Sequence, residues 1–279
     1  MASAARRDDR KLVSAVVGQW ERIAERAAVL AAQECAQPSR LPGWSAADLV
    51  LHTAGSAAAL AAALAGPPPP AADARPERLL SVESYLAAPA GLAGLGPRDD
   101  APNGTAADTR WGAETRWGAG ERGRLRSRLS DGIAAAVAGL AGVDPARPVM
   151  TAAGGMRLGD LLVALAVDGV VHGLDLGVDP HRDAVRIVVR TFTGLLVARA
   201  PGRCVEVRVP PFAAVQVVDG PRHTRGTPPN VVETDPVTFV DVAVGRLSWV
   251  DAVADGRVRA SGSRADLRPY LPLLEIPLL

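Results

Sequence analysis

Two ionisable side chains lie in the middle of an apolar segment of the chain. Residues 158–176 contain no proline and consist mostly of Leu, Val, Ala and Gly, which predicts a helix buried on most of its sides. Asp168 and His172 are four positions apart, so on a helix they lie on one face, one turn from each other. A carboxylate in such surroundings must be paired, protonated or bound to a metal. The pair therefore indicates either a divalent-metal site or a buried Asp–His hydrogen bond that only holds helices together.

His52 is a third polar group that is expected to point inward. Ser45 followed by Asp48 has the spacing of a capping box, and it predicts the start of a helix that runs to about Leu64. His52 lies on the same side of this helix as Leu49. By itself it is either a hydrogen-bonded core residue or a metal ligand.

Neighbouring antiparallel helices of a bundle can bring such groups together in the core. Two imidazoles and one carboxylate, here His52, His172 and Asp168, are a common ligand set of catalytic zinc, which keeps one position open. Zinc binds thiolates well and lowers the pKa of a bound thiol. The set is therefore suited to presenting a nucleophile at neutral pH.

The elements that must position these residues change in kind along the chain. Apolar spacing predicts helices first, and after about residue 200 an alternating pattern predicts strands with shorter helices. We therefore predict a helical bundle over residues 1–200 and a small α+β domain over residues 201–279. The expected helices are 12–35, 45–64, 76–87, 121–140, 158–176, 183–200, 236–244, one that starts at 248, and 263–271; the expected strands are 205–209, 212–218 and 257–261.

Composition excludes several classes of protein. The formal net charge of the 279 residues is +1, which gives no reason to expect nucleic acid or an anionic membrane as a partner. Cys35 and Cys204 are far apart, so no disulfide framework is implied and a reducing cytosol fits. No signal-peptide core is present, and no apolar run of roughly 18 to 20 residues lacks a polar break. We expect a cytoplasmic monomer or homodimer that acts on a small molecule.

Several motifs resemble those of a known family. Residues 41–45 (Leu-Pro-Gly-Trp-Ser), followed by residues 48–52, resemble the N-terminal signature of mycothiol-dependent maleylpyruvate isomerases, which belong to the DinB-like group of four-helix-bundle metalloenzymes. Residues 168–176 are similar to the family's second motif, Glu-x-x-x-His followed by Gly, an apolar residue and Asp. The family's C-terminal domain has a sterol-carrier-like α+β fold, and the residues similar to it are 233–236, 245–249 and 255–262.

The resemblance implies a metal, with zinc as the expected ion, held by His52, Asp168 and His172. It also implies mycothiol, whose thiolate attacks an electrophile and then either stays attached, in a transferase, or leaves after a double bond has rotated, in an isomerase. Asp168 stands where the family has Glu, so either the helices approach more closely or a water intervenes, and weaker metal binding is an alternative. Asp175 is expected to orient a ligand histidine.

Other functions stay open at this point. Arg222 and Arg225 are candidate partners for anionic groups of a substrate or cofactor, although surface charge is the simpler interpretation. Besides a mycothiol-dependent transferase or isomerase, the sequence allows a non-enzymatic small-molecule or lipid-binding protein with a relic metal site. A metal hydrolase that uses bound water is a third possibility.

Overall fold

The computed structural model describes residues 2–70, 73, 75, 78–87, 116–220 and 230–274, with residues 2–10 as helix backbone only. The chain divides into two units, and the division falls between Ala184 and Val185. This is earlier than the boundary at residue 200 that the sequence suggested. The difference arises from the helix over Arg182–Arg199, most of which belongs to the second unit. Its apolar periodicity predicts a helix but does not show which unit the helix packs with.

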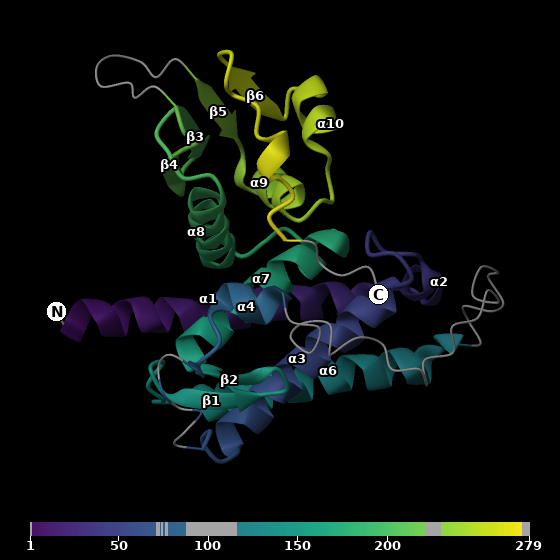
Figure 1. Cartoon of the computed structure of the whole chain (residues 1–279). Coiled ribbons are helices and arrows are strands. Elements are labelled where there is room, and N and C mark those ends of the chain that lie inside the picture. Colours follow the sequence, from purple (N-terminus) through teal and green to yellow (C-terminus); the bar gives the residue numbers. More distant parts are fainter. Residues whose placement is uncertain are drawn as a thin grey trace. The chain divides into compact units, whose positions relative to one another are not determined.

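The first unit is built on four long helices, α1 (Ala2–Val29), α3 (Ala46–Ala65), α6 (Ala119–Leu140) and α7 (Leu158–Asp175) (Figure 1). Helix α3 packs along α6, and α1 packs along α7 and α6. The predicted helical bundle is therefore confirmed. Two shorter helices, α2 (Ala32–Ala36) and α4 (Val82–Ala87), accompany it. The first predicted helix, 12–35, is in fact α1 and the separate α2.

Small residues allow α7 to approach α1 closely at the level of the candidate ligands. A Cβ added at Gly169 would lie 3.1 Å from the side chain of Gln19, and one added at Gly173 would lie 2.5 Å from it. Gln19 is fully buried, and its Nε2 donates to the carbonyl oxygen of Gly169 at 3.0 Å. This contact fixes the face of α7 that is turned toward α1, and hence the face on which Asp168 and His172 lie.

The start of α3 agrees with the sequence analysis, whereas the segment before α7 contains strands that it did not predict. The capping box of α3 is confirmed, since Asp48 N donates to Ser45 Oγ and Ser45 N donates to Asp48 Oδ2. Before α7 the structure has a β-hairpin that was not predicted, β1 (Pro148–Thr151) and β2 (Gly154–Arg157), paired antiparallel. Four-residue strands that include two adjacent glycines carry too little alternation to be recognised.

Helix α3 is long and apolar enough to meet the criteria for a membrane span. The sequence analysis did not expect this of any segment. The polar residues of α3 are Asp48, His52, Thr53 and Ser56, which are few enough for its mean hydropathy to stay high. However, 61% of the apolar window is buried inside the structure. Because α3 also packs along α6, we interpret it as a core helix of the bundle.

The second unit combines α8 (Arg182–Arg199) with a four-stranded sheet in the order β4-β3-β5-β6. The strands are β3 (Val205–Val209), β4 (Ala213–Val217), β5 (Val231–Thr234) and β6 (Val258–Ser261). Strands β3 and β5 are parallel, and the outer pairs are antiparallel. The alternation that predicted β3 is confirmed, because its three valines are buried and the residues between them are not fully buried. Strand β5 was not among the predicted strands.

The connections of this unit explain why most of α8 is grouped with it. Helix α8 bonds to the second unit through Arg199, whose guanidinium donates to the carbonyl oxygens of Tyr270, Pro272 and Leu273. Helices α9 (Pro236–Ala243) and α10 (Trp249–Ala254) begin at the predicted caps, Asp235 and Ser248. The predicted final helix over 263–271 is wrong: the chain forms only a 3-10 turn, Arg268–Tyr270, because the prolines in and after this stretch prevent a longer helix.

Candidate metal centre

Three side chains from α3 and α7 converge in the core of the first unit. His52 Nε2 lies 2.7 Å from Asp168 Oδ1, and His172 Nε2 lies 3.3 Å from the same oxygen. One ligand atom from each residue lies within 4.8 Å of the others. All three residues are buried, with at most 3% of each exposed. The expectation that His52 meets Asp168 and His172 in space agrees with this geometry.

The short Asp168 side chain reaches both imidazoles directly. The sequence left open whether closer helices or an intervening water compensate for an aspartate at this position. The distances of 2.7 and 3.3 Å favour closer helices. The second carboxylate oxygen, Oδ2, accepts a hydrogen bond from Ser56 Oγ at 3.2 Å. Ser56 follows His52 by one helical turn, a spacing that indicates a shared face, but the sequence analysis gave it no role at the site.

Asp175 lies beside His172, as predicted, but not at hydrogen-bonding distance. The separation between His172 Nδ1 and Asp175 Oδ2 is 3.6 Å, and Nδ1 is buried without a hydrogen-bond partner in the described part of the chain. The Asp175 side chain is itself buried, and its other oxygen, Oδ1, lies 3.7 Å from Arg40 Nε. Asp175 therefore stands close enough to influence His172 through its charge.

Trp44 encloses the two histidine rings, which the sequence analysis missed. Its ring meets His52 edge-on, with centroids 5.4 Å apart, and lies nearly parallel to His172, at 6.2 Å and 11°. The two imidazoles are themselves edge-to-face at 4.8 Å. The sequence analysis gave Trp44 only as part of the motif over residues 41–45, although that position places it shortly before the first histidine on the same segment. Its contacts restrict the orientation of both rings.

Burial and charge act against each other in this cluster. Burial by itself would lower the pKa of His172, but the carboxylate of Asp168 overcomes this and raises it to about 9. Burial would raise the pKa of Asp168, yet His52 and His172 hold it well below its usual range. Without a metal, the centre at neutral pH is therefore a buried carboxylate paired with an imidazolium.

This pairing predicts how the stability of the metal-free protein depends on pH. The pKa of His172 is raised from 6.5 to about 9, so its stabilising effect is complete below pH 6.5 and is lost as pH rises through 9. The Tm of chelator-treated protein is expected to fall between pH 6.5 and 9, by roughly 2–4 °C for each kcal/mol lost in a domain of this size. Calorimetry at constant ionic strength measures this fall in Tm. The variant His172→Gln should lack this slope, and an equal slope in both proteins would contradict the assignment.

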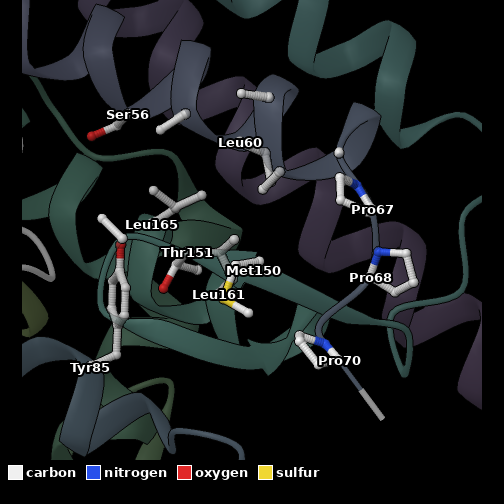
Figure 2. A pocket seen from close by; sticks show the side chains of 15 residues that line it. Ser56, Leu60, Pro67, Pro68, Pro70, Tyr85, Met150, Thr151, Leu161 and Leu165 are labelled. Atoms are coloured by element: carbon white, nitrogen blue, oxygen red, sulfur yellow. The ribbon is translucent and has the colours of Figure 1, made fainter. Parts of the chain in front are cut away.

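An apolar cavity of about 630 Å³ adjoins the centre. Ser56, the residue that donates to Asp168, belongs to its lining, and Figure 2 shows Tyr85 standing along one side with its hydroxyl directed toward the side of Ser56. Burial and the charge of Asp168 raise the pKa of Tyr85 to about 12. Its hydroxyl therefore stays protonated at neutral pH and is able to donate a hydrogen bond. The sequence analysis missed this cavity.

Two sequence-based candidates cannot be placed. Arg222 and Arg225 lie outside the described residues. The centre and its cavity as described consist of residues from α3, α4, α7, the hairpin strand β1 with its turn, and the segments before and after α3.

Comparisons with known proteins find related domains in both parts of the chain. Residues 16–177 match the family model of the mycothiol maleylpyruvate isomerase N-terminal domain, and residues 181–273 match that of the bacterial SCP ortholog. Two crystal structures of a mycothiol-dependent maleylpyruvate isomerase, one of them a mutant form, are 15% and 14% identical to the chain, each with a TM-score of 0.56. In both cases the match covers 92% of this chain and 94% of the other. No curated protein matches the chain significantly. At this identity the structures show a shared fold, and they confirm the predicted fold class.

Proposed function

Because the chain belongs to the family of the mycothiol maleylpyruvate isomerase N-terminal domain, we propose that it is a metal-dependent enzyme that activates the thiol of mycothiol for attack on an electrophilic small molecule. The observation that carries this proposal is the convergence of His52, Asp168 and His172, from two helices, on one buried point. We propose an S-transferase or a cis-trans isomerase, acting in the cytoplasm as a monomer or homodimer, with a small molecule rather than a nucleic acid or membrane as partner.

The residues present fit a divalent ion. Two imidazole nitrogens and one carboxylate oxygen are a ligand set that zinc accepts while it keeps a position open. When bound, the ion would supply a Lewis acid that lowers the pKa of a coordinated thiol. His52, Asp168 and His172 would hold it, and Ser56 would fix the second oxygen of the carboxylate, to which it donates at 3.2 Å. Asp175 would favour a proton on His172 Nδ1, which leaves Nε2 free to bind.

The surroundings of the cluster suit nucleophilic chemistry on a small electrophile. When bound, mycothiol would supply a thiolate that remains on the electrophilic carbon in a transferase or is released after rotation of a double bond in an isomerase. The protonated hydroxyl of Tyr85 is able to donate to an oxygen of the electrophile on which negative charge develops. The buried walls formed by α3 and α7 limit access of water to the cluster.

One observation favours the second candidate, a small-molecule-binding protein with a relic metal site. Asp168 already lies within hydrogen-bonding distance of His52 and Ser56, at 2.7 and 3.2 Å, and within 3.3 Å of His172. The carboxylate of Asp168 is thus satisfied without an ion. In this case the three residues hold α3 to α7, and the apolar cavity of the first unit carries the ligand.

Metal content and thiol-dependent turnover distinguish these candidates. The protein, purified without chelators, is expected to hold about one divalent ion per chain by elemental analysis, as for a single buried three-ligand site. It should also consume an electrophile such as diethyl maleate only when mycothiol is present. A protein that remains metal-free after incubation with zinc and shows no thiol-dependent turnover would refute the enzyme and leave the binding protein.

A further inference from the structure

The helix faces that carry the candidate ligands continue into the lining of the cavity. On α3, His52 is followed at helical spacing by Ser56 and Leu60, and the last two line the cavity. On α7, Leu161 and Leu165 line the cavity and precede Asp168 on the same side. The lining residues follow the ligand on one helix and precede it on the other. The two helices therefore run in opposite directions past one continuous site, with the metal ligands at one end and the cavity beside them.

The described lining is almost entirely hydrocarbon. None of these lining residues carries a charge, and the polar side chains among them are Ser56, Tyr85 and Thr151. The hydroxyls of Ser56 and Thr151 donate to Asp168 and to the carbonyl oxygen of Gly154, respectively. Tyr85 is thus the side chain in this lining best placed to donate to a ligand. The wall away from Ser56 is formed by Pro67, Pro68 and Pro70, as Figure 2 shows.

This lining selects against anions. A carboxylate bound in an apolar cavity without a cationic partner loses its hydration and gains no compensating ion pair. A substrate with two carboxylates, such as the maleylpyruvate after which the similar isomerase is named, would need cations that the described lining does not offer.

We propose that the cavity binds the hydrocarbon body of an uncharged electrophile, such as an unsaturated ester or ketone, whose carbonyl oxygen accepts a hydrogen bond from Tyr85. The assignment of an electrophile rests on the proposed function; the selection for an uncharged apolar molecule rests on the cavity alone. A volume of about 630 Å³ is within the range of small-molecule sites, and it accommodates a molecule of two fused or linked rings.

Two fluorescent probes with one hydrocarbon frame test the selectivity. N-phenyl-1-naphthylamine is uncharged, and 8-anilinonaphthalene-1-sulfonate carries a negative charge on the same ring system. The full chain is titrated with each probe, with and without zinc. We expect it to bind the uncharged probe about tenfold or more tightly than the sulfonate, because the sulfonate loses hydration on entering a partly open apolar cavity.

A matched pair of variants locates the binding site. Ala59 is an exposed residue of α3 that lines the cavity, so Ala59→Trp fills the cavity without disturbing the core. Ala58 is the exposed neighbour outside the lining, and Ala58→Trp is the control. Ala59→Trp should weaken binding of the uncharged probe about tenfold or more, because its indole would occupy the volume of the ligand, whereas Ala58→Trp should leave binding unchanged.

Two results would overturn the proposal: equal or tighter binding of the sulfonate, or equal binding by both tryptophan variants. Neither depends on mycothiol or on turnover. If the protein proves metal-free and inactive while the uncharged probe binds as described, the proposed enzyme fails and the cavity assignment holds. If thiol-dependent turnover is found while the sulfonate binds more tightly, the enzyme holds and the selectivity assigned here is wrong.

Discussion

Replacement of His172 by alanine is expected to remove the bound metal and with it the thiol-dependent activity. His172 is one of the three proposed ligands, is buried, and has its Nε2 at 3.3 Å from the shared carboxylate oxygen. Two remaining ligands do not hold a divalent ion at low concentration, so turnover with mycothiol should fall by about 100-fold or more, a loss typical of groups that position or activate a nucleophile. Elemental analysis after gel filtration and an assay of electrophile consumption measure the two effects.

His181 offers a matched control for this variant. It is the third histidine of the first unit and is partly buried; it packs against Gly18 on α1 and takes no part in the cluster. His181→Ala should therefore retain metal and activity, while its stability falls through lost packing. If His172→Ala keeps a full complement of metal, or if both variants lose activity to the same extent, the assignment of His172 as a ligand is refuted.

Conversion of Asp168 to asparagine is expected to have the largest effect on stability. This change keeps the size of the side chain but removes the charge that stabilises the imidazolium of His172, which lies 3.3 Å away. Loss of one partner of a buried ion pair costs about 3–5 kcal/mol, because the other charge must then be neutralised or left uncompensated. Urea unfolding of the metal-free protein at pH 6.5, where His172 is protonated in the native chain, measures the difference.

Ser56→Ala provides the scale for this result. It removes one hydrogen bond, at 3.2 Å, from the same carboxylate and leaves both imidazoles in place, so it should cost about 1–2 kcal/mol. The pKa of His172, followed by NMR, should fall in Asp168→Asn, since Asp175 alone then opposes the effect of burial, and should stay raised in Ser56→Ala. An Asp168→Asn variant no less stable than Ser56→Ala would show that charge pairing does not hold the centre together.

The spacing of near neighbours in the chain was sufficient to predict the local structure that positions the candidate ligands. The spacing of Asp168 and His172 placed both on one face of α7, and the capping box of Ser45 set the start of α3, from which the position of His52 follows. The alternation of β3 and the caps of α9 and α10 were likewise readable from neighbouring residues. These features depend on residues within a few positions of each other. Over such short distances the geometry of a helix or strand determines on which face each side chain lies.

Only the tertiary structure decided which buried faces meet. Periodicity shows that a helix has a buried face, but it does not show which element packs against that face. The distance of 2.7 Å between His52 and Asp168 therefore could not be predicted from either helix by itself. The enclosure by Trp44 and the cavity beside Ser56 arise in the same way, from segments that are distant in sequence. The attachment of α8 depends on hydrogen bonds from Arg199 to residues more than 70 positions away, which helical periodicity does not reveal. The predicted final helix failed because its apolar pattern did not take account of the prolines. A contact between distant segments reflects the packing of the whole unit, and local spacing carries no information about it.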